Sequence, residues 1–216
     1  LFLGAGSVIH AVHTQNIHEM GGLGKKMKIT AWTFAIGALA LSGIFPLSGF
    51  WSKDAILTEA YNENMIYFVV GLLAAFFTAF YMARLFFLVF TGKPRKAQDG
   101  HEAHESPAVM TIPLVILAVL AVVAGFIFTP FNSWFGEWLS GGEVAEHTNW
   151  TVMILSNVVG LLGIGLGWLM YAKGSIPLDV VSAKAPWLHK LVERKYYIDE
   201  IYHAVIVVPL KALGDL

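Results

Sequence analysis

The sequence predicts an all-α protein that crosses a membrane several times. Hydrophobic residues make up 56% of its 216 residues and charged residues only 13%, against about 25% charged in ordinary soluble domains. The mean hydropathy is +0.64. Apolar residues gather in runs of about 20, the length that a helix needs to cross a hydrocarbon layer. The net charge of −1 and the low charge density exclude a nucleic-acid-binding protein and a disordered chain.

Five apolar segments follow one another along the chain, and we expect a helix in each. The first covers residues 1–13 and is too short to cross, as expected of a helix cut at its N-terminal side. The second covers residues 29–57 and contains Pro46 and Gly49, so we predict a broken span. The other three segments are long enough to cross and cover residues 65–90, 108–128 and 150–171.

The charges between these segments alternate and predict the orientation of the spans. The first and third loops and the tail carry Lys and Arg, whereas the second and fourth loops carry Glu without Lys or Arg. The basic loop residues are Lys25, Lys26, Lys28, Lys93, Arg95 and Lys96, and the acidic ones are Glu59, Glu63, Glu137, Glu143 and Glu146. Because basic loops stay on the cytoplasmic side, the second segment should begin there and end on the outer side.

The last part of the chain is predicted to be a connector followed by an amphipathic helix. Residues 175–187 contain Pro177 and Pro186, which are typical of a connecting segment. From Leu188 onward, apolar and polar residues mix with a spacing that suits a helix lying on or between other elements. The resulting predicted parts are residues 1–92, 93–174 and 175–216.

Lys53 is the one lysine that falls well inside a predicted membrane segment. A charge there costs about 2.5–3.5 kcal/mol on insertion scales. A lysine in such a place can gain and lose a proton, and transporters place ion sites beside broken helices. The alternative is an inert Lys53 that reaches the outer headgroups. The adjacent Asp54 points about 100° away around the helix, where it either pairs with a neighbouring helix or lies at the membrane edge.

His10 and Ser7 are the candidate site residues of the first segment. A neutral imidazole is tolerated in a membrane, so His10 is either a relay that organises water or a hydrogen-bonded structural histidine. Ser7 lies one turn away and is predicted to bind water or contact a neighbouring helix.

Other notable residues favour structural roles. Residues 101–105 (HEAHE) contain HExH rather than HExxH and start no apolar helix, so we expect no metal site. The chain has no Cys, which excludes cysteine-ligated metals and clusters. Arg84, near the cytoplasmic end of the third span, is expected to extend toward the headgroups. Close helix packing is predicted in the last span at Gly160, Gly163, Gly165 and Gly167.

Several blocks of sequence resemble a known family of membrane proteins. Residues 1–11 (LFLGAGSVIHA), 20–23 (MGGL) and 49–57 (GFWSKDAIL) resemble the large antiporter-like membrane subunit of respiratory complex I, in the family's order and spacing. Complex I is the proton-translocating NADH:quinone oxidoreductase, and in bacteria this is its L subunit. Residues 195–202 (KYYIDEIY) resemble the segment where the family's chain enters a long lateral helix.

This resemblance implies the end of an antiporter-like fold that takes part in proton translocation. Lys53 matches the family's lysine at the outer end of the proton path, Asp54 the acidic residue beside it, and His10 a position that is often histidine. NADH, flavin, iron–sulfur clusters and quinone would bind other subunits of the translocase, and this chain would hold no cofactor. Its partners would be other membrane subunits, including antiporter-like neighbours reached by the lateral helix, and the lipid of a bacterial inner membrane.

The same resemblance implies that the chain is a fragment from the C-terminal half of such a subunit. The family carries a central relay lysine a few residues before the block at Leu1, with histidines ahead of it. We therefore expect a lysine just upstream and no complete proton path in the chain by itself. Two alternatives stay open: a subunit of a multi-subunit monovalent cation/proton antiporter, against which residues 195–202 argue, and a structural subunit in which Lys53 is inert.

Overall fold

The computed structural model describes the chain except for residues 94–102, 128–137, 139–140, 142–148, 176–184 and 215–216. Every regular element in the described part is helical. The chain divides into two compact units, Leu1–Gly174 and Ser175–Leu216.

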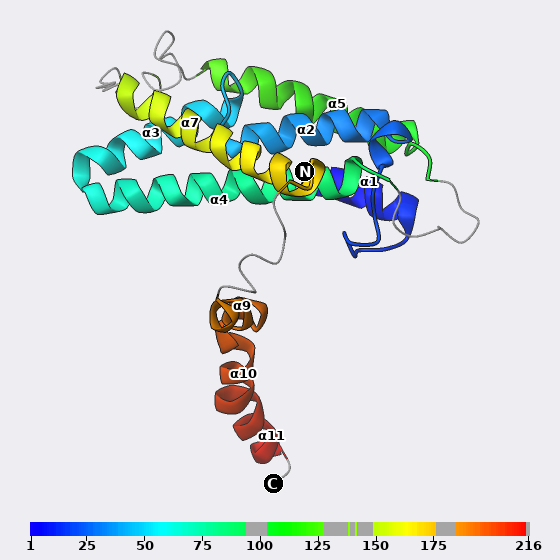
Figure 1. Ribbon diagram of the computed structural model, residues 1–216, viewed down its shortest axis with the longest axis vertical. Coiled ribbons are helices and arrows are strands. Elements are labelled where there is room, and N and C mark those ends of the chain that lie inside the picture. Colours follow the sequence, from blue (N-terminus) through cyan, green and yellow to red (C-terminus); the bar gives the residue numbers. More distant parts are fainter. Residues whose placement is uncertain (94–102, 128–137, 139–140, 142–148, 176–184, 215–216) are drawn as a thin grey trace. The chain divides into compact units, whose positions relative to one another are not determined.

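The first unit is a helical bundle whose long axes are visible in Figure 1. Its α-helices are α1 (Phe2–Val12), α2 (Lys28–Ser42), α3 (Ser48–Glu63), α4 (Met65–Phe90), α5 (Ala108–Val123) and α7 (Trp150–Gly167). Shorter turns are η1 (Leu23–Lys25), η2 (Ala124–Ile127) and the π-helical η3 (Trp168–Ala172). α4 contacts both α2 and α3, which follow one another along it, while α5 packs on α2 and α7 packs across α4.

The bundle has the composition of a membrane-embedded protein. By length and composition, 3 helical stretches can cross a membrane: Met65–Phe90, Ala108–Ile127 and Trp150–Ala172. The apolar helices α1 and α2 are shorter. Large apolar side chains point outward from the helices of the bundle, among them Val109 of α5 and Ile154 of α7. A surface of this kind is typical of contact with lipid or with other protein, and the prediction of an all-α, multi-pass membrane protein is confirmed.

The second predicted segment is interrupted between α2 and α3. α2 ends at Ser42, Gly43 adopts a left-handed φ of 75°, and a cis Phe45–Pro46 bond precedes the start of α3. Pro46 therefore lies in the break as predicted, whereas Gly49 lies inside the first turn of α3.

α3 runs further than the sequence suggested. We expected a loop over residues 58–64, but the helix continues to Glu63 and Asn64 alone separates it from α4. No Pro or Gly interrupts this polar stretch, so nothing in it stops the helix. The Asn64 side chain accepts a hydrogen bond from the Ile66 N–H at 2.8 Å and caps α4.

Glycines bring α7 against its neighbours. A Cβ added to Gly163 would lie 2.6 Å from the Phe76 carbonyl oxygen of α4, and one added to Gly167 or Gly160 would lie 2.7 or 3.2 Å from another side chain. A Cβ on Gly165 would meet nothing within 4 Å. The predicted close packing is therefore found at three of the four glycines.

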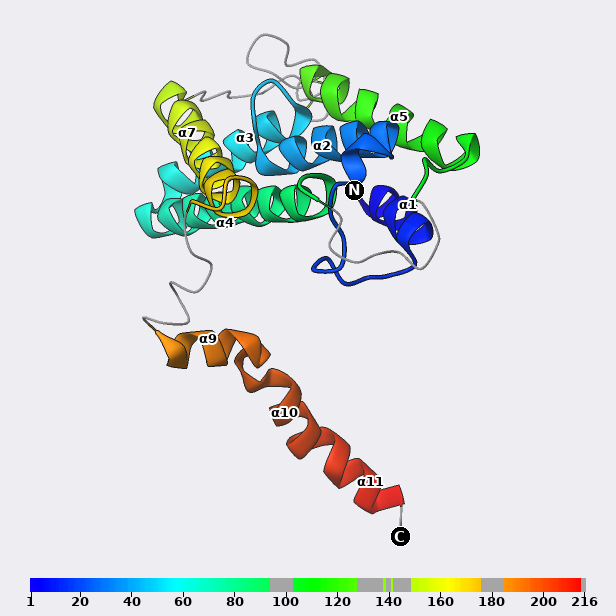
Figure 2. The same ribbon diagram turned by 45° about the vertical axis from the view of Figure 1, so that its right-hand side comes forward.

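The second unit contains a helix that starts earlier than predicted and is interrupted. α9 (Pro186–Glu193) begins with proline at its first position rather than at Leu188. Lys195, Tyr196 and Tyr197 all have positive φ, so the expected continuous helix is broken at η4 (Lys195–Tyr197). The helix then continues through α10 (Ile198–Tyr202), η5 (His203–Val207) and α11 (Val208–Gly214), at an angle to α9 in Figure 2.

A salt bridge spans this interruption. The Lys195 Nζ donates a hydrogen bond to Asp199 Oδ2 at 2.8 Å. This hydrogen bond and the negative charge of Asp199 raise the pKa of Lys195 above its ordinary value. Because both side chains are exposed to solvent, the pair contributes little to stability.

Candidate functional site

The predicted site residues lie at opposite ends of α2. Ser7 of α1 contacts Thr30 in the first turn of α2, whereas Lys53 of α3 contacts Leu41 in its last turn. At the rise of an α-helix, Thr30 and Leu41 are about 16 Å apart along the axis. The structure therefore brings Lys53 and Asp54 together at one end of α2 and places Ser7 at the other.

Side chains satisfy the backbone groups that the break leaves free. The Phe45 N–H donates to Oδ1 of Asn157 on α7 at 3.3 Å. The Lys53 Nζ donates to the Leu41 carbonyl oxygen at 2.9 Å. Carbonyls in the last turn of a helix have no partner within the helix, so Lys53 caps the C-terminal end of α2.

Aromatic side chains fix the shape of the break. The rings of Phe45, Phe50 and Trp51 lie 5.1–5.9 Å apart by their centroids. The Trp51 Nε1 also donates to the Pro46 carbonyl at 3.3 Å. α3 starts directly against α2, because a Cβ on Gly49 would lie 1.8 Å from a backbone oxygen of α2. The position of Lys53 is therefore set by a packed corner of the fold.

Lys53 is directed at the break. Its side chain is half-buried, and a Cβ on Gly43 would lie 2.9 Å from its Cδ. The Nζ lies on a carbonyl at the negative end of the α2 dipole, where a cation is favoured. Lys53 therefore has a helix-capping role that the sequence did not indicate.

Asp54 is a buried carboxylate with incomplete hydrogen bonding. Its side chain is 5% exposed and faces Ser156 of α7, which is its hydrogen-bond partner. The Ser156 hydroxyl also donates to the Met153 carbonyl at 3.0 Å, and a single hydroxyl proton serves one acceptor at a time. The Asp54 Oδ1 has no partner. Within the described residues no ion pair joins Asp54 to Lys53, so the Oδ1 atom has neither a charged nor a hydrogen-bonding partner.

A second polar group lies at the start of α2. The Ser7 Oγ is completely buried and lies 3.0 Å from Thr30 Oγ1 and 2.6 Å from Ser106 Oγ. The Thr30 hydroxyl in turn donates to Glu105 Oε1 at 2.6 Å. Ser7 thus makes the predicted contact with a neighbouring helix. His10 is exposed, and its ring lies edge-on to that of His13 at a centroid distance of 6.4 Å.

Sequence reasoning missed several polar residues of both groups. These are Thr30, Glu105 and Ser106 at the start of α2, and Ser156 and Asn157 beside the break. The pair on α7 had a visible signal, since two adjacent polar residues stand in an otherwise apolar span. Nothing in the sequence pairs Glu105 with a helix that begins about 75 residues earlier.

The HEAHE stretch has a structural explanation where it is described. Ala103 belongs to the buried apolar cluster around the start of α2, His104 is exposed, and Glu105 binds α2. Residues 101 and 102 lie outside the described residues. Among the residues that are described, no group of three His, Asp or Glu side chains could hold a metal ion.

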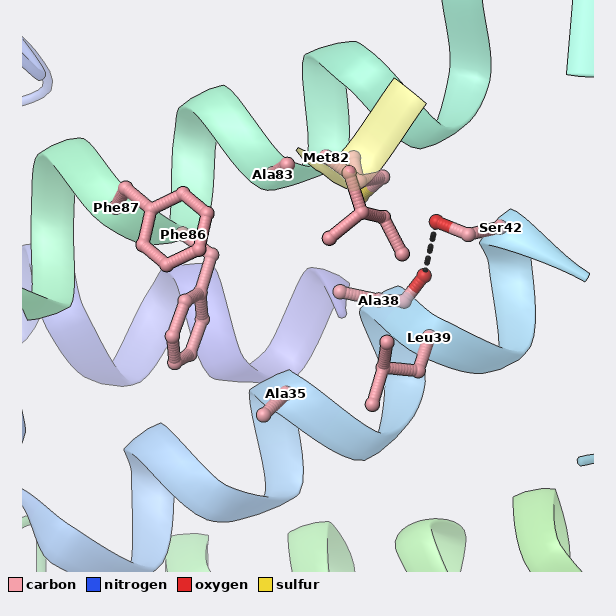
Figure 3. A pocket seen from close by; sticks show the side chains of 9 residues that line it. Ala35, Ala38, Leu39, Ser42, Met82, Ala83, Phe86 and Phe87 are labelled. Carbon is pink, nitrogen blue, oxygen red and sulfur yellow. Dashed lines mark hydrogen bonds between the residues drawn. The ribbon is translucent and has the colours of Figure 1, made fainter. Parts of the chain in front are cut away.

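Figure 3 shows an apolar pocket of about 150 Å³ between α2 and α4. It is lined by Ala35, Ala38, Leu39, Ser42, Met82, Ala83, Phe86, Phe87 and Ile164. The one hydroxyl of this lining, on Ser42, donates to the Ala38 carbonyl at 2.8 Å. The pocket therefore offers no free polar group for proton chemistry.

A larger cleft of about 390 Å³ lies between α1, α2, the start of α3 and α5. Along α2 its lining extends from Thr33, one turn beyond Thr30, to Leu41, whose carbonyl binds Lys53. Gly4 of α1 and Ser48 of α3 also line it. The cleft therefore follows α2 from the polar group around Thr30 toward the polar group around Lys53.

Comparisons with known proteins find similarity between the chain and subunits of quinone oxidoreductases. Residues 1–78 match the family described as NADH:quinone oxidoreductase/Mrp antiporter, TM. The whole chain is 41% identical over 231 residues to NADH-quinone oxidoreductase subunit L of Rickettsia bellii, covering 36% of that protein. Over 99% of its length it is 38% identical to NAD(P)H-quinone oxidoreductase chain 5 of a Picosynechococcus species, covering 38% of that protein.

A chloroplast protein gives a similar result. The chain is 39% identical over 224 residues, or 96% of its length, to NAD(P)H-quinone oxidoreductase subunit 5 of Nephroselmis olivacea, covering 35% of it. The chain thus spans little more than a third of the length of the curated relatives it matches.

Proposed function

We propose that this chain belongs to the NADH:quinone oxidoreductase/Mrp antiporter family of membrane proteins and takes part in proton translocation as part of a complex I subunit. One observation carries the proposal. An amine and a buried carboxylate, Lys53 and Asp54, stand side by side at a broken membrane helix, and one carboxylate oxygen has no partner. Ionisable groups at a helix break are the arrangement with which transporters bind ions.

In the proposed mechanism, the proton moves along α2 toward the break. The cleft beside α2 would supply the space. The proposed orientation puts Ser7 and His10 toward its cytoplasmic end and Lys53 and Asp54 toward its outer end. Lys53 accepts the proton, and its amine donates a hydrogen bond to the Leu41 carbonyl. A change of the local field then moves the proton to the outer side, with Asp54 as the neighbouring acceptor.

The energy for this step would come from other subunits. NADH, flavin, iron–sulfur clusters and quinone are proposed to bind there, and the absence of Cys excludes a cysteine-ligated cluster in this chain. The proposed partners are other membrane subunits of the complex, with the second unit reaching neighbouring antiporter-like subunits. Its exposed apolar side chains, such as Val205 and Leu213, support such contacts.

The proposed location is a bacterial inner membrane, which the chain crosses several times. The relatives from Rickettsia bellii and Picosynechococcus support a bacterial source, and the three apolar helical stretches support the membrane. The proposed orientation places the basic residues before α2 on the cytoplasmic side and the break toward the outer side.

The test uses Lys53→Ala in the intact protein within the assembled complex in lipid vesicles. The number of protons moved per NADH oxidised, measured with a pH-sensitive dye, should fall because the amine is lost. Lys25→Ala, which removes an exposed lysine of η1, is the matched control and should leave this proton yield unchanged. An assembled Lys53→Ala complex with the parental proton yield would sink the proposal.

The second candidate is a subunit of a monovalent cation/proton antiporter, because the matching family includes such proteins by its description. The names of the relatives favour the oxidoreductase. Sodium uptake into vesicles driven by a pH gradient, without NADH, separates the two functions. Such uptake, lost in Lys53→Ala, would favour the antiporter.

A further inference from the structure

α2 begins without a capping side chain of its own. The residue at its N-cap is Met27, which has no side-chain oxygen to accept from the first N–H groups. Glu105, which precedes α5, takes this role: its Oε2 accepts the Ile29 N–H at 2.7 Å and the Thr30 N–H at 3.4 Å. The positive end of the helix dipole favours a negative charge at this place.

The same carboxylate fixes the direction of a chain of hydroxyl groups. An ionised carboxylate only accepts, so the Thr30 hydroxyl donates its single proton to Glu105. Thr30 Oγ1 must then accept from Ser7, and Ser7 Oγ must accept from Ser106. The protons therefore all point from Ser106 through Ser7 and Thr30 toward Glu105. We call these four residues the hydroxyl clasp.

The hydroxyl clasp is buried and joins three parts of the fold. Ser7 and Thr30 are both 0% exposed and Ser106 is 6% exposed. Ser7 belongs to α1, Thr30 to α2, and Ser106 to the segment just before α5. One turn away, Gly4 of α1 and Thr33 of α2 line the larger cleft. The clasp therefore sets where α1 lies along the wall of this cleft.

We infer that Glu105 is a positioning residue for the proton path: acting through Thr30, it orients the Ser7 hydroxyl and holds α1 against the start of α2. Ser7 is thereby fixed as a donor to Thr30 and as an acceptor toward Ser106. The inference rests on the proposed function, because α1 and α2 form the cleft that the path would follow.

Glu105→Gln tests the direction of the clasp with little change in shape. An amide has one acceptor and one donor group, so it cannot receive both the Ile29 N–H and the Thr30 hydroxyl as a carboxylate does. If the amide NH₂ faces Thr30, the hydroxyl protons reverse and Ser7 accepts from Thr30. The variant thus alters the orientation of Ser7 while keeping the volume of the side chain.

Thr30→Val is the second variant, and Thr78→Val is its matched control. Valine removes the hydroxyl through which Glu105 acts but leaves the Ile29 and Thr30 N–H groups for Glu105 to accept. Thr78 has the same side chain on α4, and its hydroxyl donates only to the Ala74 carbonyl of its own helix. The same change is therefore made once inside the clasp and once outside it.

The experiment measures assembly and the number of protons moved per NADH oxidised in vesicles containing the intact complex. We expect Glu105→Gln and Thr30→Val to assemble and to lower the proton yield toward that of Lys53→Ala. Thr78→Val should keep the parental yield. A purely structural role would lower the amount of complex without changing the proton yield of the complexes that remain.

Each other result overturns a definite statement. Parental yields in assembled Glu105→Gln and Thr30→Val, beside a low yield in Lys53→Ala, would refute the positioning role and leave the proposed function intact. A parental yield in Lys53→Ala would refute the proposed function itself. Failure of Thr30→Val to assemble would make the clasp a folding determinant and refute its positioning role. An equal loss of proton yield in Thr78→Val would also refute the positioning role, because the effect would not be specific to the clasp.

Discussion

The two ends of α2 meet the same physical requirement in different ways. Every helix leaves N–H groups free at its start and carbonyl groups free at its end. At the start, Glu105 accepts two of these N–H groups, and each hydroxyl proton of the clasp has a defined acceptor. At the end, the Leu41 carbonyl is bound by the amine of Lys53, and the adjacent Asp54 has an oxygen without a partner.

This difference separates a fixed end from a changeable one. The start is closed by a carboxylate that accepts three hydrogen bonds and by hydroxyl groups whose donor direction Glu105 sets. The end is closed by the ionisable side chain of Lys53 next to Asp54, and the Ser156 hydroxyl has two competing acceptors there. A helix whose start has a complete set of hydrogen bonds and whose end carries ionisable side chains is suited to charge changes at that end.

The largest expected effect concerns the close backbone approach at the end of α2 that carries Lys53. Gly49→Ala places a Cβ 1.8 Å from a carbonyl oxygen of α2, and both atoms belong to backbone, so α3 must move. We expect a loss of about 3 kcal/mol or more of stability. The measurement is the melting temperature of the detergent-solubilised protein. Gly6→Ala, where an added Cβ meets nothing within 4 Å, is the control; an equal loss in both would contradict the packing argument.

Removal of the fixed end should have the second largest effect. Glu105→Ala leaves the Ile29 N–H and the Thr30 hydroxyl without their acceptor and removes a charge from the helix start. The loss of such hydrogen bonds lowers the free energy of unfolding by about 2 kcal/mol. The melting temperature should fall clearly, and His104→Ala, an exposed neighbour, should leave it unchanged.

Removal of the amine should affect stability less than function. Lys53→Met breaks the hydrogen bond to Leu41 but also removes a half-buried charge, so the net loss should be about 1 kcal/mol. The fall in melting temperature should be smaller than for Glu105→Ala. If Lys53→Met destabilises the protein more than Glu105→Ala does, the distinction between a fixed and a changeable end is wrong.

The smallest expected effect lies at the edge of the break. Asn157→Ala removes the acceptor of the Phe45 N–H, whose N···O distance of 3.3 Å indicates a weak hydrogen bond. We expect a loss of about 0.5 kcal/mol. Ser52→Ala, an exposed serine of α3, serves as control. A loss as large as that of Gly49→Ala would mean that Asn157, rather than the packing, holds the break.

Hydropathy and charge were sufficient to predict the membrane helices and the break. A long apolar run is stable in lipid only as a helix, because its backbone groups must form hydrogen bonds within the segment. Pro46 favours a break, since it lacks the N–H that a helix interior needs. The extension of α3 to Glu63 escaped this reasoning, because a polar helix gives no apolar signal.

The detailed geometry of the site was less predictable. Lys53 and Asp54 stood out because charge is rare in a membrane segment. The clasp did not, because its hydrogen bonds join residues up to 99 positions apart and serine and threonine are ordinary in membrane helices. The amine's contact with Leu41 also depends on how the chain turns at Gly43, which composition does not specify.

The single residue between α3 and α4 has a mechanical consequence. Asn64 is extended and its side chain caps α4, so the two helices meet at a stiff corner with no slack. A loop of several residues would absorb a shift of α3, but one residue cannot, and the displacement must pass into α4. α4 is in turn packed against the Gly163 face of α7. A charge that moves at Lys53 would therefore shift α3 and, through α4, the helix α7 on the other side of it.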